Sequence, residues 1–294
     1  MRGLFACTLL ARLEEASPGF LNRTDLFAGT STGGILALGF ANGSPPDELA
    51  GLYREHGAAI FDDSLWDDVA DIGKAIGADY TLDGLRLALR SHFGATLRLR
   101  DLRKRVLVPT FDLDAPANAD HPRVWKPKFF HNYPGPDSDG EELVRNVALR
   151  TSAAPTYFPS YQGYIDGGVV ANNPSVAALA QALALTGAAR RLDDVTLLSV
   201  GTGIEPKYIQ GDTLNWGWTQ WASPIVSLIT NGLTGVADYQ CRQLLGARYL
   251  RLNAFLDRAV PMDDPRPETL EWIEGEARRF ELGPAVRWLA RVGW

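Results

Sequence analysis

Cysteine, histidine and positive charge are all scarce in this sequence. Its 294 residues include two cysteines, Cys7 and Cys241, and four histidines, and the formal net charge is −6. Two cysteines are too few for a disulfide scaffold and suit a reducing compartment, so we expect a cytoplasmic protein. A protein that binds nucleic acid normally presents a basic face, so we expect no nucleic acid among the partners.

Long apolar runs and metal-binding motifs are absent as well. No stretch of about 18 or more uncharged apolar residues occurs, so no membrane-spanning segment is expected. The carboxylates and histidines show no metal-ligand spacing such as H-E-x-x-H, and we expect neither a metal nor another cofactor. With 46% hydrophobic and 22% charged residues, the chain can bury a sizeable core, as a globular protein does.

The first residues resemble a signal peptide only superficially. Met1 and Arg2 precede the apolar run GLFACTLLA, but Arg12 and two glutamates follow without a small-residue cleavage site. Since the apolar positions of this stretch fit one face of a helix, we predict an ordinary amphipathic helix from residue 3.

Short apolar strands then alternate with helices. Such an alternation is typical of a parallel sheet covered on both faces. No composition shift or repeat marks a boundary, so we predict an α/β fold in one domain over residues 1–294. The expected strands are 26–29, 105–114, 163–170, 195–203 and 247–254, and the expected later helices are 31–42, 45–61, 82–93, 141–155, 173–185, 267–281 and 284–292. Residues 115–140 are expected to form a loop, interrupted by the extended stretch KPKFFHNY.

The stretch DLFAGTSTGGILALGF places a serine in a G-x-S-x-G pattern between a strand and a helix. In that context the turn forces Ser31 into a strained backbone, and flanking glycines let strand and helix approach. The helix dipole and the free amides at the helix start favour a developing oxyanion. We predict that Ser31 is a nucleophile held in an elbow of Gly29, Thr30, Gly33 and Gly34. The alternative is a Gly/Ser turn that only caps the helix.

A serine nucleophile needs a base, and the histidines do not supply one in the expected order. Ser-Asp-His hydrolases carry their histidine after the aspartate, whereas the last histidine here is His131. We therefore do not favour a histidine triad.

The stretch GYIDGGVVANNPS offers another base. Asp166 follows an apolar strand and precedes Gly167 and Gly168, so a strand again delivers a polar side chain to an uncrowded turn. A free aspartate, with a pKa of about 3.9, is a weak base at neutral pH, so its pKa must be raised, most simply by desolvation. Taken alone, the motif is also typical of an ordinary Asp-Gly turn.

Together the two motifs, with RTSAAPTYFP and LLSVGTG, resemble the patatin-like phospholipases over nearly the whole chain. The resemblance implies a three-layer α/β/α fold with a mostly parallel sheet. It implies a Ser-Asp dyad without histidine or cofactor, with Ser31 as nucleophile and Asp166 as base. It also implies hydrolysis of phospholipids or other lipid esters through an acyl-enzyme, as a phospholipase A or lysophospholipase does.

The family's glycine-rich oxyanion loop, D-G-G-G-x-[RK]-G, is the part that does not match. Arg2 and Gly3 match its end and Met1 occupies its x, but the three glycines and the preceding strand are missing. Together with Thr32, which follows the serine, Arg2 and Gly3 form the remnant of this motif. Two interpretations remain: the natural protein continues upstream with a strand and the glycines, or it is a truncated, inactive member that binds lipid or a protein partner. We expect the upstream continuation, because the strand at 26–29 is apolar on both faces.

Two further stretches have alternative interpretations. The segment 215–233 places Trp216, Trp218 and Trp221 beside an apolar run, as at a lipid–water interface, but a helix that lies against the core is the favoured interpretation. The basic residues of RLRDLRKR (98–105) suit a solvated face better than a phosphate site. Peripheral membrane contact is therefore an open expectation, and the oligomeric state is not predicted.

Overall fold

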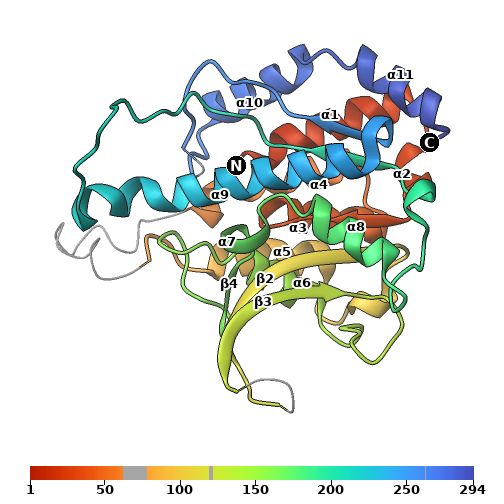
Figure 1. Ribbon diagram of the computed structural model, residues 1–294, viewed down its shortest axis with the longest axis horizontal. Helices are drawn as coiled ribbons and strands as arrows, with labels where there is room; N and C mark the ends of the chain where they lie inside the picture. The colour runs from red at the N-terminus through yellow and green to blue at the C-terminus, as the bar shows by residue number, and fades with distance from the viewer. Residues whose placement is uncertain (62–77, 119–121, 262) are drawn as a thin grey trace.

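The computed structural model describes residues 1–61, 78–118, 122–261 and 263–294, and it shows an α/β fold with helices on both sides of the strands (Figure 1). The strands are β1 (Leu26–Ala28), β2 (Arg105–Ala115), β3 (Val124–His131), β4 (Tyr164–Asp166), β5 (Leu197–Val200) and β6 (Tyr249–Leu252). The first helices are α1 (Gly3–Ala16), α2 (Phe20–Arg23), α3 (Thr32–Asn42), α4 (Pro46–Ile60), α5 (Asp83–Phe93) and α6 (Val144–Thr151). The later helices are α7 (Gly168–Ala171), α8 (Ser175–Leu183), α9 (Trp218–Leu245), α10 (Pro267–Arg279) and α11 (Gly283–Val292). The predicted fold class is confirmed.

Strand β2 organises the larger sheet. On one edge it pairs with β1 in parallel and, further along, with β4 in antiparallel orientation. On the other edge it pairs with β3, again antiparallel, so that the sheet is mixed. Strands β5 and β6 pair in parallel as a separate two-stranded sheet. Within the described residues, β1 therefore has a strand partner on one edge only.

The helices cover β2 on both sides. Val106 and Val108 point to one face, where they pack against apolar side chains of α3, α5 and α6. Helix α7 packs on β2, and α8 packs on both β1 and β5. A second core lies among α1, α4, α10 and α11. Of these, α1, α10 and α11 lie at the opposite end of the molecule from the β2–β3 hairpin (Figure 1). This arrangement is the three-layer sandwich expected from the sequence.

One sequence-based interpretation is confirmed and another needs correction. The region 115–140 is loop interrupted by an extended stretch, as predicted, and that stretch forms the strand β3 at 124–131, which pairs with β2. The tryptophan-rich segment does lead into a helix, α9, but its first half does not lie against the core: Trp218 is 91% exposed. Within the described residues, no helix has both the length and the apolar character needed to span a bilayer.

Candidate active site

The sheet brings two sequence motifs together at one point. Strand β1 ends with Ala28 opposite Leu107 of β2, and β4 ends with Asp166 opposite Thr110 on the same edge. Because β1 runs parallel and β4 antiparallel to β2, their carboxyl ends point at each other across Pro109. Polar residues that follow the two strands must therefore meet there.

Ser31 occupies the turn between β1 and α3 with a strained backbone. Its φ is 56° and its ψ is −126°, a region that side chains with a Cβ rarely adopt and that is found at functional sites. The predicted strain is therefore present. Thr32 begins α3, and the amide of Gly34 donates to the Ser31 carbonyl at 2.8 Å. Ser31 is half-buried, which leaves its side chain within reach of a ligand.

The elbow glycines have different roles. A Cβ on Gly29 would lie 1.9 Å from the carbonyl oxygen of Gly33, and one on Gly34 would lie 2.7 Å from Cγ2 of Thr151. Only glycine therefore permits this close approach of strand and helix. A Cβ on Gly33 would meet open space, so the expectation that glycines on both sides relieve crowding holds for Gly29 and Gly34 but not for Gly33.

Asp166 lies beside Ser31 in a buried position. Its carboxylate accepts a hydrogen bond of 2.7 Å from the amide of Gly168. Burial raises the pKa of Asp166 to about 6, against the lowering effects of the neighbouring Ser31 side chain and of the Gly168 amide. A carboxylate with this pKa is ionised at neutral pH yet accepts a proton more readily than an exposed aspartate does. Gly167 packs so closely on β2 that its Cβ would lie 2.2 Å from the Pro109 carbonyl.

The end of α6 holds both motifs in place. The Thr151 hydroxyl accepts a hydrogen bond from the Ser31 amide at 3.0 Å and donates one to the Pro109 carbonyl at 2.6 Å. Two residues later, the Ala153 carbonyl accepts a hydrogen bond from the Asp166 amide at 2.9 Å. The sequence singled out this RTSAAP stretch only as part of a resemblance, and it carried no signal for these contacts because they join residues that are far apart in the chain.

A further bridge connects the serine turn to the segment after Asp166. The Thr30 hydroxyl donates to the carbonyl of Ala171, at the end of α7, at 2.6 Å. Thr30 is buried, so this bond is shielded from water. The two catalytic candidates are thus fixed relative to each other through α6 and through α7.

The amino-terminal ends of α1 and α3 converge beside Ser31. A Cβ on Gly3 would lie 2.1 Å from Oγ1 of Thr32, and the Thr32 and Tyr53 hydroxyls are 2.6 Å apart. Amides in the first turn of a helix have no acceptor within that helix and can bind an anion. Of the predicted remnant, the structure brings Gly3 and Thr32 together, whereas the guanidinium of Arg2 pairs with Glu205 at 2.7 Å.

Two of the described histidines form ion pairs with other residues than Ser31 and Asp166. His131 is buried on β3, opposite Leu107, and its Nε2 lies 3.6 Å from an oxygen of Asp137. His92 pairs with Glu48 of α4 at 3.2 Å. His56 is half-buried on α4, and His121 lies outside the described residues. Within the described chain, no group of three His, Cys, Asp or Glu side chains could hold a metal ion.

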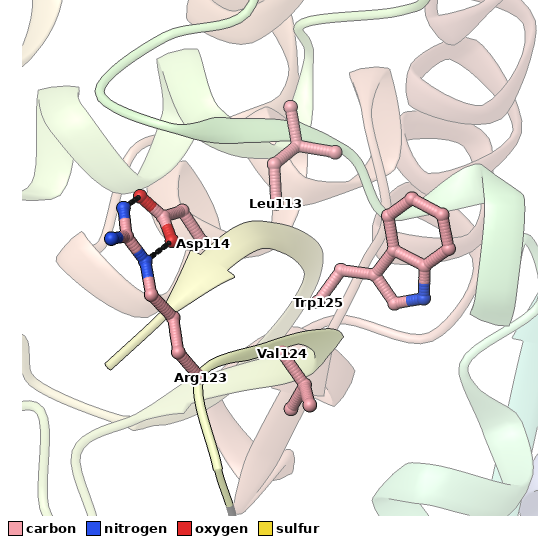
Figure 2. Close-up of a pocket in the computed structure, with 5 residues that line it drawn as sticks. All are labelled: Leu113, Asp114, Arg123, Val124 and Trp125. Carbon is pink, nitrogen blue, oxygen red and sulfur yellow. Dashed lines mark hydrogen bonds and ion pairs between the residues drawn. The ribbon is translucent and has the colours of Figure 1, made fainter. Parts of the chain in front are cut away.

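Figure 2 shows a recess at the far end of the β2–β3 hairpin, lined by Leu113, Asp114, Arg123, Val124 and Trp125. Arg123 binds the Asp114 carboxylate through two nitrogens, so that this pair is already satisfied. Neither Ser31 nor Asp166 lines this recess, which offers no nucleophile or free base. The recess therefore offers no alternative to the candidate site at the meeting point of β1 and β4.

Comparison with known proteins agrees with this geometry. The sequence model of a family described as patatin-like phospholipase matches residues 1–179. Protein teg of Priestia megaterium is 30% identical over 98% of this chain and 94% of its own length. A cGAMP-activated phospholipase of Pseudomonas aeruginosa is 32% identical over 88% of this chain and 76% of its own. Patatin-like protein 2 of Oryza sativa subsp. indica is 28% identical over 92% of this chain and 78% of its own.

Proposed function

The chain belongs to the patatin-like phospholipase family, and from this premise we propose that it is a serine hydrolase of lipid esters that uses Ser31 and Asp166. The observation that carries the proposal is the placement of the Ser31 side chain beside the buried Asp166 carboxylate, whose pKa is raised to about 6 by burial. A nucleophile with a base beside it is the minimum that acyl transfer requires. The substrate class is a phospholipid or lysophospholipid, as the family description and the phospholipase relative suggest.

The reaction begins with attack of Ser31 Oγ on the ester carbonyl carbon while Asp166 accepts the hydroxyl proton. The tetrahedral intermediate collapses as Asp166 passes this proton to the departing alcohol, which leaves an acyl-enzyme on Ser31. Asp166 then takes a proton from water, the hydroxide attacks the acyl carbon, and the same proton restores the Ser31 hydroxyl. The products are a fatty acid and the alcohol part of the lipid.

The negative oxygen of the intermediate needs hydrogen-bond donors. The amides of Thr32 and Gly3 lie in the first turns of α3 and α1, whose starts pack against each other beside Ser31. One such donor contributes roughly a hundredfold to a thousandfold in rate. We assign these two amides to the oxyanion and give the Arg2 side chain no catalytic part, since Glu205 binds it. Both cysteines are free and buried, in keeping with our assignment of the protein to the cytoplasm.

The test is labelling of the natural full-length protein with an alkyl fluorophosphonate, followed by mass spectrometry of the modified peptide. We expect the label on Ser31, and we expect Ser31→Ala and Asp166→Asn to lose labelling and fatty-acid release from a phospholipid panel. Ser17→Ala, which changes a serine beyond the end of α1, is the matched control and should label normally. A folded wild-type protein that neither labels nor releases fatty acid would favour the alternative, a non-catalytic module that binds lipid or protein.

A further inference from the structure

Helix α9 shows apolar side chains to solvent over residues 218–236, about its first two-thirds. Trp218, Ile225, Ile229 and Val236 are all exposed, from 40% for Ile225 to 91% for Trp218. They are spaced seven, four and seven residues apart, so they lie in one line along the helix. We call this line the α9 outer stripe.

The side of α9 opposite the stripe carries polar residues. Ser227, Thr230 and Thr234 are half-buried there, while the stripe residues are exposed. The Thr230 hydroxyl donates to the Val226 carbonyl at 2.9 Å, and the Thr234 hydroxyl donates to the Thr230 carbonyl at the same distance. A surface helix of a globular protein normally buries its apolar side and exposes its polar side. Along the stripe, α9 instead exposes its apolar residues, and an apolar surface outside the protein would cover them.

The last turns of α9, from Ala237 onward, have the ordinary arrangement. Ala237, Cys241 and Leu245 are buried, and the last two belong to an apolar cluster with Leu179 of α8. These turns anchor the helix to the protein. The reversal is therefore confined to the turns that carry the outer stripe, and it is not a property of the whole element.

Helix α9 also lies beside the catalytic centre. Helix α7, which follows Asp166 in the chain, packs against α9, and the Asn172 side chain donates to the Thr234 hydroxyl at 3.0 Å. The outer stripe lies on the far side of that contact, about one helix diameter, roughly 10 Å, away. A surface that binds the stripe would thus be held next to Ser31 and Asp166.

Resting on the proposed function, we propose that the α9 outer stripe inserts into the interface of a phospholipid bilayer and holds the active site at the membrane. No charged residue occurs between Asp212 and Asp238, although 22% of the residues in the whole chain are charged. A surface without charges can leave water for a membrane without the large free-energy cost of desolvating an ion. Trp216 and Trp221 contact each other at 5.1 Å between ring centroids near the start of the helix, and tryptophan is well suited to the headgroup level. A coiled coil with a second copy fits less well, because such interfaces use flanking charges to select the partner.

The absence of basic residues determines which membranes should bind. Electrostatic attraction to anionic lipid cannot contribute at the stripe, and the protein as a whole carries a charge of −6. Binding to vesicles of zwitterionic phosphatidylcholine should therefore be at least as strong as binding to vesicles with added phosphatidylglycerol. It should also change little with salt, because screening affects charge interactions and not apolar burial.

The experiment is co-sedimentation of the full-length protein with phosphatidylcholine vesicles. We expect the wild type to sediment with the vesicles. The double variant Ile225→Asp/Ile229→Asp should bind about tenfold or more weakly, because two apolar side chains that would enter the bilayer are replaced by two charges. Leu87→Asp, at a 70% exposed leucine on α5, is the matched control and should bind like the wild type. Equal thermal midpoints would show that the variants are folded.

Hydrolysis of a water-soluble short-chain ester separates this inference from the proposed function. Failure of the wild type to sediment, together with turnover of the soluble ester, would overturn the membrane surface and leave the hydrolase intact. Stripe-dependent sedimentation without ester turnover would retain the membrane surface and refute the hydrolase. A dimer that the double variant dissociates, with no vesicle binding, would assign the stripe to a second copy of the chain and overturn the inference.

Discussion

The backbone amide of Ser31 donates a hydrogen bond of 3.0 Å to the hydroxyl of Thr151. This contact joins the strained turn after β1 to the last residue of α6, and Thr151 in turn donates to the Pro109 carbonyl in the gap between β1 and β4. Thr151 is fully buried, so neither bond can be replaced by water without rearrangement. Thr151 is therefore a positioning residue for the nucleophile.

Replacement of Thr151 tests that role. Thr151→Val keeps the shape but leaves the Ser31 amide and the Pro109 carbonyl unpaired, and each unpaired buried group destabilises by about 1–3 kcal/mol. We expect kcat to fall by roughly tenfold to a hundredfold, with KM little changed, because the attack angle of Ser31 is no longer held. Thr151→Ser retains the hydroxyl and should recover most of kcat. Equal kcat values for the two variants would refute a positioning role.

The pH dependence of activity should follow Asp166. Its carboxylate must be ionised to accept the serine proton, and its pKa is raised to about 6. We therefore expect kcat/KM to fall about tenfold per pH unit below that value, in a profile measured with a soluble ester. If kcat/KM instead began to fall only near pH 4, as expected for an exposed carboxylate, the effect of burial on the Asp166 pKa would be contradicted.

The same pKa shift predicts a change in stability with pH. The pKa of Asp166 is 3.8 in the reference state and about 6 in the folded protein. Between these values the unfolded chain has already lost the proton that the folded chain keeps, so ionisation destabilises the fold as pH rises. The free energy of unfolding of Asp166→Asn, relative to that of the wild type, should increase by up to about 3 kcal/mol as pH rises through this window. Above the window the difference should stay constant. Urea unfolding of both proteins across this pH range measures the difference. The contributions of the other carboxylates are the same in both proteins and cancel in the comparison. A constant difference would show that Asp166 is not desolvated.

The two outer glycines of the serine turn should respond differently to alanine. Gly29→Ala would place its Cβ 1.9 Å from the Gly33 carbonyl oxygen, which is backbone and cannot move aside, whereas at Gly33 the Cβ would meet open space. We expect Gly29→Ala to destabilise by about 3 kcal/mol or more. Gly33→Ala should be neutral or stabilise by up to about 1 kcal/mol, because alanine favours the helix. Thermal unfolding of the two variants, each compared with the wild type, measures the difference in stability. Similar losses of stability in both variants would mean that the turn is packed differently.

Histidine should not be needed for catalysis. His131 is buried and directed toward Asp137, so His131→Gln should keep most of the activity. Single replacement of the other histidines should do the same. The acidic limb of the pH profile should persist in each variant, which separates Asp166 from a histidine of similar pKa. A loss above about a hundredfold in a folded His131 variant would restore the histidine triad as an explanation.

The sequence by itself determined the fold class and the bounds of several helices, but not the bounds of the strands. It also allowed Ser31 and Asp166 to be proposed as nucleophile and base, because their signals are local: each lies at the end of a short apolar strand and is flanked by glycine. Helix bounds such as those of α3 and α5 follow from the same local preferences, with Gly43 and Gly94 directly after their last residues. The expectation that burial must raise the Asp166 pKa also required only its apolar neighbours.

Only the tertiary structure decided how these local elements combine. The sheet register brings the carboxyl ends of β1 and β4 together on one edge of β2, and no local pattern records a register between residues that are more than fifty positions apart. The role of Thr151 and the pairing of Arg2 with Glu205 depend on the same long-range packing. The composition of α9 is equally compatible with a buried helix and an exposed one. Its outward apolar stripe arises because the second half of the helix and Thr234 set its rotation on the protein.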